Sequence, residues 1–278
     1  MTLILFTSLL LMGAIAAGVI GSLSGLGGGI VLIPLLTLLL GVDIHYAIGA
    51  ALVSVIATSS GSAAAYVKSG VANMRLGMFL EIATTAGAVG GAILSAYAPT
   101  SYISVLFGLA LLFSAGNSIR KKQETIVDSP NALAQKLKLS STYPESPNAD
   151  VRYVPKNVIG GFSMMGLAGM LSGLLGIGSG AFKVIAMDTI MRIPFKVSTT
   201  TSNFMMGVTA LASSVIYMQK GYIVPDICLP VLIGVLLGAM IGSKILMSTD
   251  PKKLRYFFAG IIVFLALNMI YSGLKGNL

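Results

Sequence analysis

Long apolar stretches alternate with short polar ones along the whole chain. Most of the apolar stretches approach the 20 or so residues that a helix needs to cross a bilayer, so we expect an all-α integral membrane protein. They lie at about 2–23, 28–41, 46–67, 74–97 and 100–118 and then, beyond a polar stretch at 119–156, at 157–175, 179–191, 197–218, 226–247 and 254–272.

Two of the apolar segments, 28–41 and 179–191, are too short to span. At 1.5 Å per residue, roughly 13 residues cover about 20 Å of a hydrocarbon core that is about 30 Å thick. Each short segment starts at a glycine-rich stretch, Ser24–Gly29 or Leu175–Gly180. Glycine destabilises helix interiors, and a membrane tolerates broken backbone only where protein buries it or a wet cavity solvates it. We therefore predict Gly-broken or re-entrant helices that end at mid-membrane.

The two sets of segments form a repeat. A shift of 151 residues superposes them without gaps, and glycine, tyrosine and asparagine identities recur in this one register over about a hundred residues. We expect an N-terminal transmembrane repeat at 1–118, a linker at 119–156 and a C-terminal repeat at 157–278, with about five helical segments in each repeat. The pairs include Gly25 with Gly176, Gly27 with Gly178, Gly29 with Gly180, Thr58 with Thr209, Tyr66 with Tyr217 and Asn117 with Asn268.

The loop charges predict that the second repeat is inverted relative to the first. If every segment crosses once, fourteen Lys and Arg residues fall on the side of the 119–156 linker, and only Lys220 and Lys275 fall on the other side. Basic residues collect in cytoplasmic loops, so we place the linker in the cytoplasm and both termini outside. Matching loops then lie on opposite sides, as in inverted-topology repeats. The compact chain fits the plasma membrane of a bacterium or an archaeon.

Composition excludes several classes of protein. Only 10% of the 278 residues are charged and the mean hydropathy is +0.91, whereas soluble domains carry about 25% charged residues. The net charge of +9 lies on no soluble basic face, so we expect no nucleic-acid partner. One cysteine and one histidine leave no disulfide framework, metal site or catalytic set, so we predict neither an enzyme nor a cofactor. No Lys or Arg precedes Lys68, so the first apolar segment lacks the basic start of a signal peptide and is interpreted as a retained helix.

The glycine breaks are the first candidate binding site. A turn that leads into a helix offers unpaired N–H groups and the positive end of the helix dipole, which suit an anion. The alternative is close helix packing through small residues, which we prefer for Gly87, Gly91, Gly238 and Gly242. The candidate residues are Gly27, Gly28, Gly29, Gly178, Ser179 and Gly180.

Polar residues inside the apolar segments add further candidates. Thr199, Thr200 and Asn203 open a segment, and their side chains suit hydrogen bonding to an oxyanion, helix capping or interhelical packing. Lys183 follows the second break by three residues, and an ionisable residue within a membrane is a functional candidate by default. We consider three roles for Lys183. It neutralises an anionic substrate, or it pairs with Asp188, or its side chain extends to the membrane interface.

Glu81 and Asp188 are candidates for proton coupling. The alternative for each carboxylate is a simple ion pair, with Arg75 or with Lys183.

The chain resembles the TauE/SafE family of permeases, also called the TSUP family. The resemblance rests on Gly25-Leu26-Gly27-Gly28-Gly29 followed by Pro34, then Ala47–Leu52, Lys68-Ser69-Gly70 and Met74-Arg75-Leu76. It covers both halves and leaves out the linker, although Gly49-Ala50-Ala51 stands where the family typically has Gly-Thr-Ser. The resemblance implies an integral membrane exporter of small sulfur-containing or organic anions, such as sulfite, sulfoacetate or sulfonates.

The sequence hypothesis is therefore a secondary transporter of a small anion that works by alternating access and couples to protons. An uncoupled anion channel, or a transporter of a non-sulfur organic anion, is the alternative. A membrane-embedded enzyme is disfavoured because no nucleophile or metal set exists. The bilayer and a small anion are the expected partners, and the sequence does not determine the oligomeric state.

Overall fold

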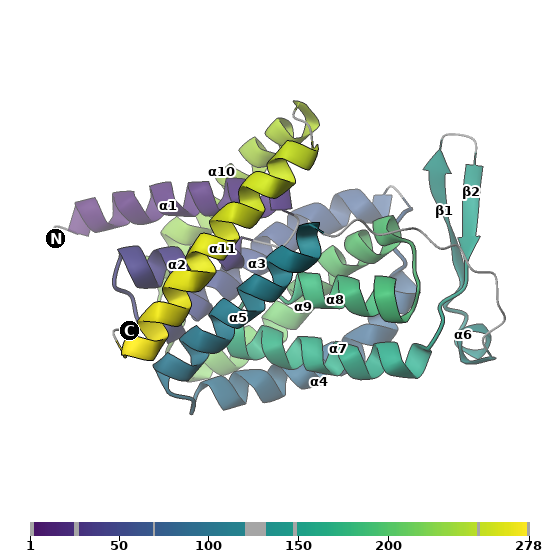
Figure 1. The fold of residues 1–278 in the computed structure, drawn as a ribbon, viewed down its shortest axis with the longest axis horizontal. Helices are drawn as coiled ribbons and strands as arrows, with labels where there is room; N and C mark the ends of the chain where they lie inside the picture. The colour runs from purple at the N-terminus through teal and green to yellow at the C-terminus, as the bar shows by residue number, and fades with distance from the viewer. Residues whose placement is uncertain are drawn as a thin grey trace.

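The protein is a bundle of long helices with a small hairpin at one end (Figure 1). The computed structural model describes residues 3–24, 28–68, 70–119, 132–146, 149–248 and 251–276. The all-α prediction is confirmed, with the two-stranded hairpin as an addition that it did not include. The long helices are α1 (Leu3–Ser24), α3 (Ile44–Lys68), α4 (Met74–Ser95), α5 (Thr100–Ile119), α7 (Val158–Leu175), α9 (Phe195–Gln219), α10 (Pro225–Ser248) and α11 (Pro251–Lys275).

Each glycine break leads into a short compound helix. In the first half, α2 (Gly29–Pro34) continues as the π-helix η1 (Leu35–Leu39), and in the second half α8 (Gly180–Ile185) continues as the π-helix η2 (Ala186–Ile190). Eleven residues at 1.5 Å each cover about 16 Å, so each compound helix is far shorter than a span. The structure thus places helix breaks where the sequence predicted them.

The element boundaries of the two halves correspond. The helices α3 and α9 are both 25 residues long, and their first residues are related by the same shift that superposes the two sequence repeats. The starts of α2 and α8, and those of α4 and α10, are related by this shift as well. Gly41 and Arg192 are another such pair, and both have left-handed backbone, with φ of 65° and 53°. Arginine rarely adopts left-handed backbone. Because Arg192 adopts it nevertheless, we infer that the fold requires this conformation at both equivalent positions.

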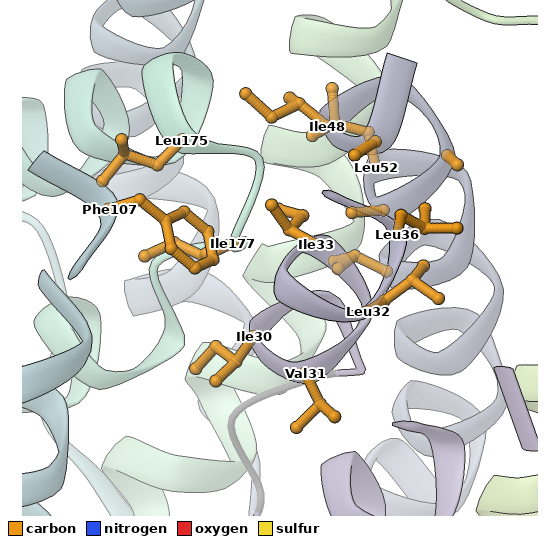
Figure 2. Close-up of a cluster of buried hydrophobic side chains, with 14 of the residues drawn as sticks. Ile30, Val31, Leu32, Ile33, Leu36, Ile48, Leu52, Phe107, Leu175 and Ile177 are labelled. Carbon is orange, nitrogen blue, oxygen red and sulfur yellow. The ribbon is translucent and has the colours of Figure 1, made fainter. Parts of the chain in front are cut away.

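The long helices pack in pairs across the two halves. The helix α4 packs on α7, α1 on α10, α5 on α11 and α3 on α9, while α2 lies against α3 and α8 against α9. The set of pairs is symmetric under the repeat. If each helix is replaced by its equivalent in the other half, the pair of α4 and α7 becomes the pair of α10 and α1, and the pair of α5 and α11 is unchanged. Figure 2 shows the apolar centre, where Ile33 of α2 faces Phe107 of α5 and Ile177 of the second glycine break.

Glycines let two of these helix pairs approach closely. A Cβ atom added at Gly91 of α4 would lie 2.0 Å from the carbonyl oxygen of Met170, and one at Gly173 of α7 would lie 1.9 Å from that of Ala88. Gly238 of α10 meets the carbonyl oxygen of Ile15 in the same way, at 2.1 Å. Gly87 of α4 likewise meets the carbonyl oxygen of Gly166, at 2.1 Å. The packing interpretation of Gly87, Gly91 and Gly238 is therefore confirmed, and that of Gly242 stays a prediction.

The chain between the halves folds onto the bundle. Within it, α6 (Ala132–Lys136) precedes the antiparallel strands β1 (Ser141–Ser146) and β2 (Ala149–Tyr153). Asn73 caps α4 by accepting from the Leu76 N–H, and its Nδ2 donates to the Leu139 carbonyl at 3.0 Å and to the Tyr153 hydroxyl at 2.8 Å. Burial raises the pKa of Tyr153 to about 12, so this phenol stays neutral. The described part of the predicted linker thus includes a hairpin that is docked on the start of α4.

Apolar side chains cover the outside of the helices as well as the inside. Met12, Ile82, Leu211 and Phe264 are among the exposed large apolar residues, and such continuous exposure is typical of a surface that meets lipid. Among the described residues, α4 and α7 are long and apolar enough to cross a membrane, and six shorter apolar stretches fall in other helices. Both chain ends lie at the end of the molecule opposite the hairpin (Figure 1).

Candidate functional site

The second glycine break reverses the chain between α7 and α8. Gly176 ends α7 with φ of 68°, Gly178 has φ of 66° and Ser179 has φ of 46°. Glycine adopts this left-handed backbone freely, whereas a residue with a Cβ does so at a cost. The three left-handed residues turn the chain back so that α8 packs on α7 and α9.

The two glycine breaks meet at the interface between the halves. A Cβ atom on Gly29 would lie 3.1 Å from the Gly176 carbonyl oxygen, and one on Gly178 would lie 3.0 Å from Val55 of α3. Gly28 forms the turn before α2 and is buried, while Gly27 lies outside the described residues. This juxtaposition explains why small residues are needed at both breaks. Anion binding by their N–H groups stays a prediction.

Lys183 of α8 is fully buried, with 0% of its side chain exposed. Its Nζ lies 3.8 Å from Oε2 of Glu81 and donates a hydrogen bond to the Thr209 hydroxyl. The sequence offered Asp188 as the partner of Lys183, whereas the structure pairs it with Glu81. A buried lysine must be paired, because desolvating an isolated charge is very unfavourable.

Glu81 supplies the negative charge from the other half of the protein. It is the eighth residue of the 22-residue α4, so it lies about 10 Å along the helix from its start. Its Oε1 accepts hydrogen bonds from Thr209 at 2.5 Å and from Thr85 at 3.3 Å. Its Oε2 is buried and has no hydrogen-bond partner. Oε1 thus accepts two hydrogen bonds, whereas Oε2 can still accept one.

The remaining predicted residues lie on α9 and η2. Thr199 and Thr200 each donate to a carbonyl one turn earlier in α9, those of Phe195 and Lys196, both at 2.9 Å. Their hydroxyl protons are therefore engaged within the helix. Asn203 is buried in α9, and Asp188 is half-buried in η2. The substrate and proton roles of these four residues stay predictions.

Thr209 is the site residue that sequence reasoning missed. It aligns with Thr58 in the repeat, but a threonine within an apolar helix usually bonds its own backbone. Here the hydroxyl lies 3.0 Å from the Met205 carbonyl oxygen of its own helix and also joins Lys183 to Glu81, and so connects α8 and α9 to α4. The available sequence signal was that the repeat places a threonine at this position in both halves.

Ser59, in a run of small hydroxyl residues at 58–60, is a second residue outside the predicted set of site residues. Its hydroxyl donates to the Asn203 carbonyl at 2.5 Å and accepts from the Gly207 N–H at 2.9 Å. The Asn203 carbonyl and the Gly207 N–H belong to residues four apart, and in a regular α-helix they would form a hydrogen bond with each other. A side chain of α3 thus enters the hydrogen-bond ladder of α9 less than two turns before Thr209, and such insertions are a recognised cause of helix bending.

Two further hydroxyl groups flank the second break. Ser172 and Ser179 are buried, and among the described residues their Oγ atoms are two of four buried side-chain oxygens without a hydrogen-bond partner. A buried hydroxyl without a partner is unfavourable. Together with the Lys183–Glu81 ion pair, the region therefore offers one positive charge, its counter-charge and two hydroxyl groups without partners.

Comparisons with known proteins agree with this picture. The family model described as "Sulfite exporter TauE/SafE" matches residues 9–269. The chain is 29% identical over 277 residues to "Probable membrane transporter protein YunE" of Bacillus subtilis, which covers 97% of this chain and 98% of that protein. It is 27% identical to "Probable membrane transporter protein YdhB" of the same organism over 82% of this chain and 85% of that protein. A third relative, "Probable membrane transporter protein MJ0441" of Methanocaldococcus jannaschii, is 24% identical over 96% of each chain.

No solved structure matches the chain. The family match covers nearly the whole length, and the three relatives match both halves rather than one. The chain therefore belongs to the sulfite exporter TauE/SafE family and is a multi-pass membrane transporter, not an enzyme.

Proposed function

We propose that the protein is a secondary transporter of a small anion, with a sulfur oxyanion or organosulfonate such as sulfite or sulfoacetate as its substrate. The observation that carries the proposal is Lys183, a fully buried cation whose counter-charge at 3.8 Å comes from the other half of the protein. An anion that enters the interface neutralises Lys183 in place of Glu81. The family description supports sulfite and export as the direction.

The transport cycle that we propose is alternating access between two inverted repeats. Supporting it, element boundaries recur at the shift that relates the two sequence repeats, and the helix pairs are exchanged by swapping the halves. The glycine breaks, which we assign as re-entrant, bring the start of α2 close to the Gly176 carbonyl at the end of α7. Rocking of one half against the other would then expose one site to either side in turn.

We assign proton coupling to Glu81 rather than to Asp188. Glu81 is the carboxylate that contacts Lys183, so its charge and that of the substrate act on the same cation. Ser179 and the N–H groups of the breaks, including Gly28, Gly29, Gly178 and Gly180, stay our candidates for contacts with the anion. The 119–156 segment is assigned to the cytoplasm and both termini to the outside of a plasma membrane.

Uptake into liposomes tests this function directly. Purified protein is reconstituted, and uptake of labelled sulfite, sulfoacetate and lactate is measured with and without an imposed pH gradient. We expect saturable uptake of the sulfur anions that responds to the gradient. Uptake that neither saturates nor responds indicates a channel, a preference for lactate indicates a carrier of non-sulfur organic anions, and no uptake of any anion refutes the proposal.

A further inference from the structure

We propose that Thr209 is a positioning residue that makes anion binding at Lys183 and protonation of Glu81 depend on each other, so that one proton accompanies each anion. This inference rests on the proposed anion-transport function and deepens it. It is carried by the hydrogen-bond geometry of a single hydroxyl group that lies between the two charges.

The Thr209 hydroxyl has one proton and two acceptors within reach. It receives a hydrogen bond from Lys183 Nζ, which as an ammonium group has no lone pair and only donates. Its own proton is directed either to Oε1 of Glu81 at 2.5 Å or to the Met205 carbonyl oxygen at 3.0 Å. Rotation about the C–O bond moves the proton from one acceptor to the other, and no heavy atom has to move.

These two orientations serve the two protonation states of Glu81. In the empty transporter Glu81 is ionised, Thr209 donates to Oε1, and the carboxylate balances the charge of Lys183. In the loaded transporter a hydronium ion from solution has given its proton to the carboxylate at Oε1, so that one O–H bond forms there, one breaks in the donor and water is released. The Glu81 O–H now donates to Thr209, and Thr209 turns its own proton to the Met205 carbonyl. The Thr209 hydroxyl, Oε1 of Glu81 and the Lys183 ammonium group each keep a hydrogen-bond partner in both states.

The charge balance then links the proton to the anion. Protonated Glu81 no longer neutralises Lys183, so the buried ammonium group needs another negative charge, which the substrate supplies. Conversely, an anion beside Lys183 repels an ionised Glu81 and favours its protonation. Proton and anion therefore bind together and move in the same direction. The sum of the proton gradient and the anion gradient determines that direction.

No other described charge competes for Glu81 on the helices packed against α4. The helix α7 carries no titratable residue between Val158 and Leu175, and α8 contributes Lys183 itself. On α9 the titratable residues are Lys196 and Tyr217, which lie at least two turns from Thr209 along the helix. On α4 the nearest is Arg75, which is exposed and donates to the Lys138 carbonyl.

The test compares Thr209→Val and Thr209→Ser with the unaltered protein in liposomes. The probe is labelled sulfoacetate, whose two acid groups are both ionised between about pH 6 and 8, so any transported proton belongs to the protein. Internal pH is followed with a trapped dye. The unaltered protein should move about one proton per sulfoacetate. Thr209→Val keeps the shape but removes the hydroxyl that donates to ionised Glu81, accepts from protonated Glu81 and accepts from Lys183. KM at pH 7 should therefore change about tenfold and the pH–rate profile should shift by about one unit, with kcat nearly unchanged.

Thr209→Ser keeps the hydroxyl and should retain the original KM and pH profile. The inference is overturned if Thr209→Val keeps the original KM and pH profile, or if Thr209→Ser changes both of them. It is also overturned if sulfoacetate enters the liposomes without protons. Should Thr209→Val fail to fold, the proton-to-anion ratio of the unaltered protein still decides. These results are distinct from failure of the proposed function, in which the unaltered protein shows no saturable uptake at all.

Discussion

At the scale of single residues, the two halves of the protein differ at the buried charges. The position that aligns with Lys183 in the first half is Leu32, and the position that aligns with Glu81 in the second half is Leu232. Of the three site residues, Thr209 alone keeps its residue type, as Thr58. The charge pair therefore occurs once in a pseudo-symmetric fold. The two positions that the repeat makes equivalent to it are both occupied by leucine.

This asymmetry supplies a matched set of variants for the charge pair. Lys183→Leu leaves Glu81 as a buried, unpaired charge and should lower the free energy of unfolding by about 3–5 kcal/mol, whereas Lys183→Leu combined with Glu81→Leu should recover most of that loss. Thermal unfolding in detergent measures the difference. Neither variant should transport anions, because the cation is gone. Lys220→Met, at an exposed position where Nζ lies 4.7 Å from the centre of the Tyr97 ring, should lower stability by no more than about 1 kcal/mol.

A Lys183→Leu variant as stable as the original would show that Lys183 and Glu81 do not form a desolvated ion pair. A double variant that still accumulates sulfite would remove Lys183 from the binding site. Lys183 and Glu81 were visible in the sequence because charges are rare within apolar segments. Thr209 was not, since threonine is a common packing residue in membrane helices and only the contact between three helices identifies it.

At the scale of helices, the glycines determine which pairs approach closely. Gly91 of α4 lies against the Met170 carbonyl of α7, whereas a Cβ atom on the adjacent Gly90 would have nothing within 4 Å. The sequence predicted the breaks at Gly29 and Gly180 and the small-residue contacts, because helix-breaking and small residues are local signals. It did not predict the hairpin, because strands with Pro144 in one of them form here by docking on the bundle rather than by intrinsic propensity.

The neighbouring glycines of α4 provide a controlled test of helix packing. Gly91→Ala places a methyl group 2.0 Å from the Met170 carbonyl oxygen, so α4 and α7 must separate, and we expect a loss of about 1–3 kcal/mol. Gly90→Ala should be neutral or slightly stabilising, because alanine is the better helix former. Thermal unfolding of both variants in the same detergent measures this. Equal stability of the two would mean that α4 and α7 do not cross as closely as described.

The docked hairpin gives a second prediction at this scale. Asn73→Ala removes the cap of α4 and the two hydrogen bonds to Leu139 and Tyr153, so its buried partners lose about 1–3 kcal/mol of hydrogen bonding. Limited proteolysis should then cut the hairpin faster than in the original protein. Arg75→Ala, which loses only an exposed 3.4 Å contact to the Lys138 carbonyl, serves as the control. Equal cleavage rates for the two variants would show that Asn73 does not hold the hairpin in place.

At the scale of the whole molecule, the question is whether the two halves run in opposite directions across the membrane. The charge distribution in the sequence predicts that they do, and both chain ends lie opposite the hairpin (Figure 1). An inverted pair would allow a single site between the halves to face either side, as the proposed transport cycle requires. A parallel pair would put the equivalent loops on one side, and an exchange of conformation between the two halves would then not convert an inward-facing state into an outward-facing one.

Two equivalent loop positions decide between these arrangements. Gly41 and Arg192 are exposed, share left-handed backbone and are paired by the repeat, so cysteine introduces similar strain at each. In a Cys228→Ala background, which removes the one native thiol, Gly41→Cys should react with a membrane-impermeant maleimide on intact cells. Arg192→Cys, which lies in a basic loop, should react only after the membrane is permeabilised. Labelling of both from the same side would show that the repeats are parallel, and alternating access by exchange of the two halves would have to be abandoned.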